Sequence, residues 1–138
     1  SQGDRWHDGF NLDCHVLHPD AVSIHGTDND KSLVLRVTLA GRKLLLTGDV
    51  EGHVSRALAD EAGHCDWLLA PHHGGEQSEA ERWMKRTQPR WFCVSSKQSK
   101  PMAELQKGRV QCWNTAEHGA ISFHFRGEQA IVTTWLKP

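Results

Sequence analysis

Hydrophobic and polar positions follow several different periods along the chain, and each period predicts an element. Residues 12–17 alternate polar and apolar side chains, the pattern of a half-buried strand, and residues 6–10 are an expected companion strand. Residues 32–39 are rich in branched apolar side chains, and a tight turn around Gly41 joins them to residues 43–47. This second pair is typical of a β-hairpin.

Two segments have helical spacing instead. Residues 50–62 carry apolar side chains at every fourth position, and Gly63 behind them is a strong stop signal. Residues 76–87 form the second expected helix. In that segment Ser78 is the expected N-cap, and Glu81, three residues on, completes a capping-box pattern.

Strands and helices alternate in the middle of the chain. Residues 43–47, 65–70 and 91–94 are expected strands, separated by the two helices. This order predicts an α/β fold whose strands are parallel and joined by right-handed crossovers. The carboxyl ends of parallel strands meet at one edge of the sheet, where ligands bind in open α/β sheets. That edge is therefore expected to gather Asp49, His72, His73, Ser95 and Ser96.

The carboxyl-terminal third of the chain is less regular. Residues 101–107 suggest a short helix, residues 110–113 a short strand and residues 114–119 a turn. Residues 120–125 and 129–135 are predicted to form a closing antiparallel hairpin.

Length and charge narrow the classes of function. The 138 residues are expected to form one domain, residues 1–138, and no apolar run is long enough to span a bilayer, so the chain by itself is expected to be soluble. Sixteen basic and 17 acidic residues argue against a strongly basic nucleic-acid surface. The candidate for a local basic patch is the set Lys97, Lys100, Lys107 and Arg109. The same residues are also consistent with an ordinary solvent-exposed face.

An aspartate and a pair of histidines are the strongest chemical signal. Asp49 follows an expected strand, where its carboxylate can bridge two cations or, alternatively, cap the next helix. The run His-His-Gly-Gly at residues 72–75 follows the next strand, and its glycines allow a sharp turn and close approach of a substrate. Taken alone, this run also suits a polar loop. Together at one sheet edge, the carboxylate and the imidazoles favour a metal site.

These groups are too few for a hydrolytic centre, because each ion needs at least three protein ligands and an open position for water. His118, beside a turn glycine, is the best further candidate for the edge of the site. The four scattered cysteines suit small buried hydrophobic residues rather than zinc ligands or disulfides. No nucleophile elbow or phosphate-binding glycine loop is present, so no small-molecule cofactor is expected. The histidines without ligand spacing are His15, His18, His25, His53, His64 and His118.

Five runs of sequence resemble one family. In order and spacing they look like the metallo-β-lactamase-like domain of ComEC, the membrane channel of bacterial DNA uptake, over residues 3–125. The part of the resemblance that is specific to this family is the occurrence of Leu-Thr-Gly-Asp followed by Pro-His-His-Gly in this order. The five runs are residues 29–35, 44–49, 70–75, 88–95 and 115–121.

The resemblance implies a partial αββα sandwich. This chain would be its carboxy-terminal half, a mixed sheet with a βαβαβ core and a closing antiparallel hairpin. The resemblance also implies that Asp49 bridges two divalent metal ions, zinc or manganese, and that His72, nearer the strand end, is the second ligand. Asp49, His72 and His73 would then be the catalytic group. The implied substrate edge is Gly74, Gly75, Ser95 and His118.

The activity that the resemblance implies is hydrolysis of phosphodiesters, by a nuclease acting on the single DNA strand that is not taken up. The implied partners are the amino-terminal remainder of the domain and a membrane channel region. The implied location is a soluble domain of a bacterial inner-membrane protein, on the extracytoplasmic side.

The chain departs from the family in three places. The leading metal motif, His-x-His-x-Asp-His, is absent, so the metal site is incomplete and the chain alone is expected to be inactive. Residues 97–101 lack the family's His-Pro, and Gly75 stands where a serine is common. Two other functions stay open: a non-catalytic relic or interaction module that keeps the fold, and a small-ester hydrolase of the same fold.

Overall fold

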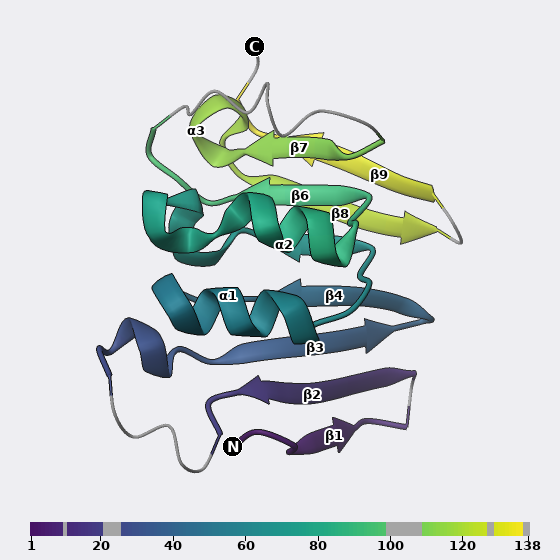
Figure 1. Ribbon diagram of the computed structural model, residues 1–138. Coiled ribbons are helices and arrows are strands. Elements are labelled where there is room, and N and C mark those ends of the chain that lie inside the picture. The colour runs from purple at the N-terminus through teal and green to yellow at the C-terminus, as the bar shows by residue number, and fades with distance from the viewer. Residues whose placement is uncertain (10, 21–25, 99–108, 127–128, 137–138) are drawn as a thin grey trace.

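A seven-stranded mixed sheet forms the centre of the computed structural model, which describes residues 1–9, 11–20, 26–98, 109–126 and 129–136 (Figure 1). Its strands lie in the order in which they occur along the chain. They are β1 (Arg5–His7), β2 (Leu12–His18), β3 (Val34–Leu39), β4 (Arg42–Leu46), β5 (Trp67–Leu69), β6 (Trp91–Val94) and β7 (Gln111–Asn114). The helices are α1 (Gly52–Glu61), α2 (Ala80–Thr87) and α3 (Thr115–His118), and β8 (Ile121–Arg126) pairs with β9 (Gln129–Thr134) in a separate hairpin.

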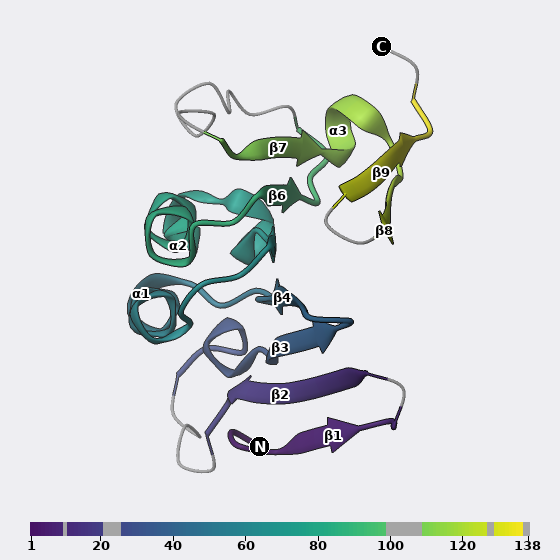
Figure 2. The ribbon, with the colours of Figure 1, turned by 90° about the vertical axis from the view of Figure 1, so that its right-hand side faces the viewer.

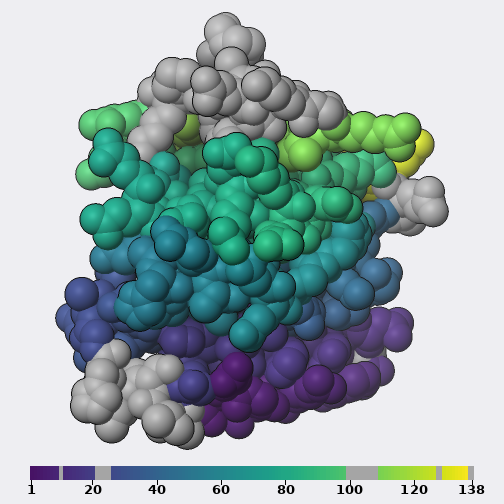
Figure 3. Space-filling model, viewed as in Figure 1, coloured from purple at the N-terminus to yellow at the C-terminus, as the bar shows by residue number. Residues whose placement is uncertain are grey.

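The central part of the sheet has the predicted topology. Strands β1 to β4 pair antiparallel, whereas β4, β5, β6 and β7 pair parallel. The crossovers between β4, β5 and β6 are α1 and α2, which lie side by side on the same face of the sheet (Figures 1 and 2). In the space-filling view their segments, in teal and green, form the middle of the surface that faces the viewer (Figure 3). Buried Leu45, Leu68 and Phe92 from three neighbouring strands pack there in one core with Leu58 of α1 and Trp83 of α2.

The opposite face of the sheet is only partly covered among the described residues. The β8–β9 hairpin lies over the β5–β7 end, where Phe123 packs edge-on against three indoles, those of Trp67, Trp91 and Trp113. Figure 2 shows that no described element lies over the same face of β1 to β3, and on β4 the hairpin reaches Arg42, whose guanidinium lies 5.4 Å from the Phe125 ring. A row of apolar residues in register continues from Trp67 across that part of the sheet: Leu44, Val37, Cys14 and Trp6.

The expected helix over residues 76–87 is wrong in its first turn. Glu76–Ser78 forms a separate 3₁₀ turn, and α2 begins at Ala80 because Glu79 takes a left-handed φ of 56°. The capping box therefore does not form, although the Ser78 hydroxyl accepts a hydrogen bond from the Ala80 N–H at 3.3 Å.

The expected turn at residues 114–119 is also wrong in part. It contains the single helical turn α3, whose N-cap Asn114 accepts a hydrogen bond from the Ala116 N–H. The strand expected at residues 6–10 is β1, which ends at His7. The short helix expected at residues 101–107 lies outside the described residues. Within the described ranges, every helix is too short or too polar to cross a membrane.

The described layers are thus a pair of helices, a sheet and a hairpin over one end of the sheet's other face. The mixed α/β class and the βαβαβ core are confirmed. The full αββα sandwich requires a second sheet across the remaining face and stays a prediction.

Candidate metal centre

The tips of β4 and β5 are held together by two hydrogen bonds. The Thr47 hydroxyl, buried just after β4, donates to the Leu69 carbonyl at 2.7 Å. The His72 N–H donates to the Gly48 carbonyl at 3.0 Å. Because both bonds cross from one strand tip to the other, Asp49 and the histidine pair keep a defined relative position.

His73 lies between the tips of β4 and β6. Its Nδ1 atom is 2.7 Å from the Ser95 carbonyl oxygen, and its Nε2 atom is 3.6 Å from Asp49 Oδ1. Since a carbonyl can only accept, Nδ1 carries the proton, and in the neutral ring the lone pair is on Nε2. The His73 and Asp49 side chains are 62% and 49% exposed, so solvent reaches both donor atoms.

His72 faces the opposite way. Its Nδ1 atom lies 2.6 Å from Oε2 of Glu51, and the other oxygen of that carboxylate accepts a hydrogen bond from the Asn29 amide at 3.1 Å. His72 and His73 have φ angles of 44° and 52°, a left-handed conformation that is costly for residues other than glycine. This backbone turn sends the two imidazoles to different partners.

The separation of His73 and Asp49 suits a shared cation. At 3.6 Å the two atoms are too far apart for a hydrogen bond, but ligands each about 2.1 Å from one zinc ion in tetrahedral geometry are separated by a similar distance. Two donors are fewer than the three that a catalytic ion needs. Within the described part of the chain, no group of three or more His, Cys, Asp or Glu residues could hold a metal ion. The residues therefore fit part of a metal site.

A cavity of about 420 Å³ adjoins this donor pair. His73 and Ser95 line it together with Lys97 and Thr115. The Thr115 hydroxyl fixes the loop after β6, because it accepts a hydrogen bond from the Ser96 N–H and donates one to the Ser96 carbonyl. The structure thus brings together Asp49, His73 and Ser95, as expected from the parallel strands.

His118 does not line this cavity. Its Nδ1 atom donates to the Asn114 carbonyl at 3.0 Å, and its ring packs edge-on against Trp113. His118 therefore supports the wall formed by α3, one helical turn behind Thr115.

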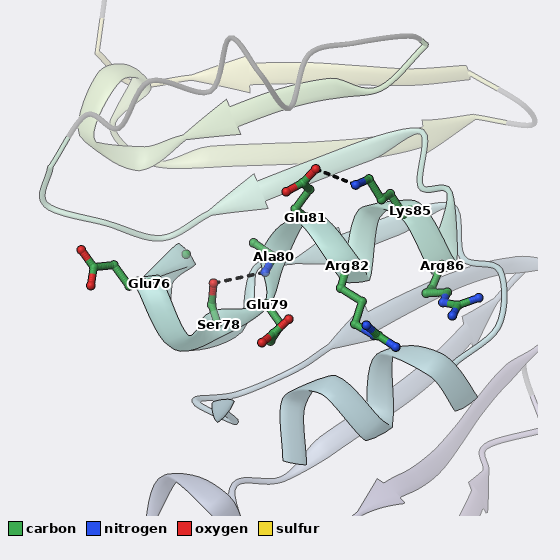
Figure 4. Close-up of a pocket in the computed structure, with 10 residues that line it drawn as sticks. Glu76, Ser78, Glu79, Ala80, Glu81, Arg82, Lys85 and Arg86 are labelled. Carbon is green, nitrogen blue, oxygen red and sulfur yellow. Dashed lines mark hydrogen bonds and ion pairs between the residues drawn. The ribbon is translucent and has the colours of Figure 1, made fainter. Parts of the chain in front are cut away.

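Gly74 and Gly75 border a different hollow, of about 900 Å³, on the outer side of α2 (Figure 4). Its basic side chains are already paired, since Lys85 binds Glu81 and both Arg82 and Arg86 bind Asp60 of α1. At Gly75 an added Cβ would lie 3.2 Å from the His72 carbonyl oxygen, so a serine at this position would crowd the turn. The role of these glycines here is to let the chain turn.

Two residues near the site have no counterpart in the sequence-based expectation. Glu51 is the N-cap residue of α1, and it approaches His72 only because the β5 tip turns back over β4. Asn29 reaches the same carboxylate from 22 residues away in sequence. The alternative role for Asp49, as helix cap, is not realised, because α1 begins at Gly52. The sequence signal that could have identified Glu51 is its position two residues after Asp49.

The cysteines match the expectation of small hydrophobic residues without disulfides. Cys65 and Cys93 are buried, and all four thiols, including those of Cys14 and Cys112, are free. Burial raises the pKa of Cys65 to about 11 and that of Cys93 to about 12, so both remain thiols at neutral pH.

Gly48, between the strand and Asp49, should tolerate no side chain. Its φ is +57°, and an added Cβ would lie 2.9 Å from the Leu33 carbonyl oxygen. We expect Gly48→Ala to lower the free energy of unfolding by about 1–3 kcal/mol, measured by urea denaturation. Gly63→Ala is the matched control, because Gly63 has a φ of +64° but open space around it, and about 1 kcal/mol is expected there. Equal losses in the two variants would contradict the clash.

The fold and this edge define an α/β protein that presents an Asp–His donor pair at the carboxyl ends of its parallel strands. No family model matches the chain. It is similar to ComE operon protein 3 of Bacillus subtilis (strain 168), with 26% identity over 125 residues, which cover 83% of this chain and 16% of that protein. The chain is thus distantly related to ComEC and spans about a sixth of that relative's length.

Proposed function

We propose that this chain is the carboxy-terminal part of a metal-dependent phosphodiesterase domain of the ComEC type, acting on single-stranded DNA. The observation that carries the proposal is the position of His73. Its protonated Nδ1 is held by the Ser95 carbonyl, and its Nε2 lone pair is directed to Asp49 at 3.6 Å. Holding a ligand histidine through its second nitrogen is a common feature of metal sites in proteins.

In this proposal Asp49 and His73 hold the ion, and His72 with Glu51 fixes the strained turn that presents His73. A bound divalent cation, zinc or manganese, would supply Lewis-acid chemistry and lower the pKa of water toward neutrality. The cavity beside His73, with the exposed Lys97 at its rim, offers positive charge to a phosphate group.

The uncovered sheet face supports the proposed partner, the amino-terminal remainder of the domain. Trp6 is 55% exposed and Leu39 44%, and both lie on the uncovered face, Trp6 in the row of Cys14 and Val37 and Leu39 two residues after Val37. A sheet normally buries its apolar face against another layer, and large exposed apolar patches mark interaction sites. We propose that the remainder contributes the second sheet and the missing metal ligands, and that the domain belongs to an inner-membrane channel on its extracytoplasmic side.

Binding of Mn²⁺ followed by NMR line broadening tests the ligand assignment. We expect the signals of Asp49, His73 and Ser95 to broaden first, and Asp49→Ala or His73→Ala to weaken Mn²⁺ binding at least about tenfold. His53→Ala, which removes an exposed histidine from α1, is the matched control and should have no effect. The His73→Ala variant tests His73 against His72, the ligand that the resemblance implied, because binding should weaken tenfold only if His73 is a ligand. Equal broadening at His53 and His73 would exclude the site.

With two donors in place, the chain alone is expected to bind metal weakly and to show no nuclease activity. The measurement is cleavage of a labelled single-stranded oligonucleotide in the presence of Mn²⁺ or Zn²⁺. Robust cleavage that disappears in Asp49→Ala would overturn the expectation that the remainder of the domain is needed.

A second candidate function is a non-catalytic interaction module. The observation in its favour is that the described residues supply two metal donors and a long uncovered apolar row. Failure of Mn²⁺ to broaden any signal near Asp49, in a chain that folds normally, would support this module instead of the hydrolase.

A further inference from the structure

A small apolar cavity, here called the hairpin cavity, lies between the large sheet and the β8–β9 hairpin. Its volume is about 200 Å³. Ile121 and Phe123 of β8 form one wall, and the strands opposite contribute Trp67, Leu69 and Cys93. An apolar cavity of about 150 Å³ in a protein core stays dry and binds a benzene ring. By that comparison the hairpin cavity is large enough for one six-membered ring with small substituents.

The hairpin cavity adjoins the Asp49–His73 pair. Ser95 and Thr115 line both this cavity and the larger one beside His73. The Ser95 carbonyl oxygen is also the atom that lies 2.7 Å from His73 Nδ1, so the apolar walls begin one residue away from the proposed metal ligand. A ligand that fills both cavities therefore has an apolar ring on one side of Ser95 and a polar group on the other.

The indole N–H of Trp67 gives the hairpin cavity a polar group. Its Nε1 atom is buried and has no hydrogen-bond partner of normal geometry among the described residues. The Cys93 thiol interacts with this indole, but sulfur is a weak acceptor. A buried donor without a strong acceptor costs free energy, which a carbonyl oxygen on a ligand recovers. Aromatic and aliphatic walls with one placed donor are typical of a small-molecule site.

We propose that the hairpin cavity binds one pyrimidine base of a single-stranded DNA, with the phosphate of that nucleotide beside Asp49 and His73. The inference rests on the proposed function, because it names the part of the substrate that lies next to the metal pair. A pyrimidine is a single six-membered ring that carries a carbonyl oxygen, so it matches both the size of the cavity and the Trp67 donor. Proteins that bind single strands commonly place bases against aromatic side chains, which Trp67 and Phe123 supply here.

NMR titration of the whole chain with thymidine 5′-phosphate, without added metal, tests the hairpin cavity, because each indole N–H gives its own signal. We expect the Trp67 signal to shift, and the signals of Trp6 and Trp135, whose side chains are 55% and 62% exposed, to stay in place. Deoxyadenosine 5′-phosphate, whose base has two fused rings, should bind at least about fivefold more weakly.

Two variants test the walls and the donor separately. Ile121→Phe fills the hairpin cavity from β8 and should weaken binding of thymidine 5′-phosphate at least about fivefold. Ile131→Phe is the matched control, because it adds the same volume to β9 at a position that is 50% exposed, and it should have no effect. Trp67→Phe keeps an aromatic ring but removes the N–H, and should weaken binding about threefold to tenfold. Circular dichroism confirms that each variant is folded.

Three results would each overturn the base site. They are equal affinity for the two nucleotides, equal binding by Ile121→Phe and Ile131→Phe, and a shift of the Trp67 signal by inorganic phosphate as large as that by thymidine 5′-phosphate. Because the titration contains no metal, its outcome is independent of the Mn²⁺ experiment. An absent Trp67 shift in a chain that binds Mn²⁺ normally rejects the base site alone, whereas a normal Trp67 shift without Mn²⁺ binding rejects the metal site alone.

Discussion

Trp83→Ala is expected to lower the free energy of unfolding by about 3–5 kcal/mol. The Trp83 side chain is fully buried between α2, α1 and the sheet, so its removal leaves a cavity that the packed core can fill only in part. Its indole N–H also donates to the Ser55 hydroxyl at 2.8 Å, and that hydroxyl donates to the Ser78 carbonyl at 2.7 Å. Truncation therefore removes both core volume and one bond of a buried chain of hydrogen bonds.

Guanidinium denaturation followed by circular dichroism measures this loss. Trp6→Ala is the matched control, because it deletes the same side chain from a position that is 55% exposed, and a change within about 0.5 kcal/mol is expected. Trp83→Phe keeps most of the volume but not the hydrogen bond, and should fall between the two. A loss below about 1 kcal/mol in Trp83→Ala would mean that the helices do not pack on the sheet as described.

Phe123→Ala is expected to cost about 2–4 kcal/mol and to release the β8–β9 hairpin from the sheet. Its ring lies 5.9, 6.5 and 6.3 Å from the rings of Trp67, Trp91 and Trp113, and it stacks on Phe125. Among the described residues the hairpin pairs with no strand of the large sheet, so side-chain contacts such as these attach it to that sheet.

Urea denaturation gives the stability of this variant, and tryptophan emission reports on the hairpin directly. Emission should shift to longer wavelength in Phe123→Ala, because three indoles lose their cover. Ile131→Ala, on β9 and 50% exposed, is the matched control and should change neither stability nor emission appreciably. An unchanged emission spectrum in Phe123→Ala would show that the hairpin is held by other contacts.

The two stability predictions bear on the candidate site, because each tests a layer that supports it. The helix layer ties the loop after β5 to α1 through the Ser55–Ser78 bond. The hairpin covers the strands whose tips carry His73 and Ser95. The strained turn at residues 72–73 can persist only if both layers are rigid, because left-handed residues are retained where surrounding contacts over-determine them.

The sequence by itself determined the order of elements and the edge at which the chemistry gathers. Period-2 and period-3.6 patterns alternate between residues 43 and 94, and that alternation requires parallel strands with their carboxyl ends together. From this it follows that Asp49, the pair His72 and His73, and Ser95 converge, and the structure places His73 3.6 Å from Asp49 and 2.7 Å from the Ser95 carbonyl oxygen. The motifs also pointed to ComEC, with which a distant relationship is found.

Only the tertiary structure decided which histidine turns toward Asp49. The resemblance implies His72, the residue nearer the strand end, as the ligand, but two consecutive left-handed residues rotate the pair, so that His72 meets Glu51 and His73 meets Asp49. Such φ values depend on long-range contacts: the Gly48 carbonyl, the Ser95 carbonyl and the Glu51 carboxylate. The hairpin cavity arises in the same way, since its walls belong to strands that are neighbours only in the folded chain. Periodicity reports which face of an element is buried; the direction of a side chain at a strand tip depends on partners far away in sequence.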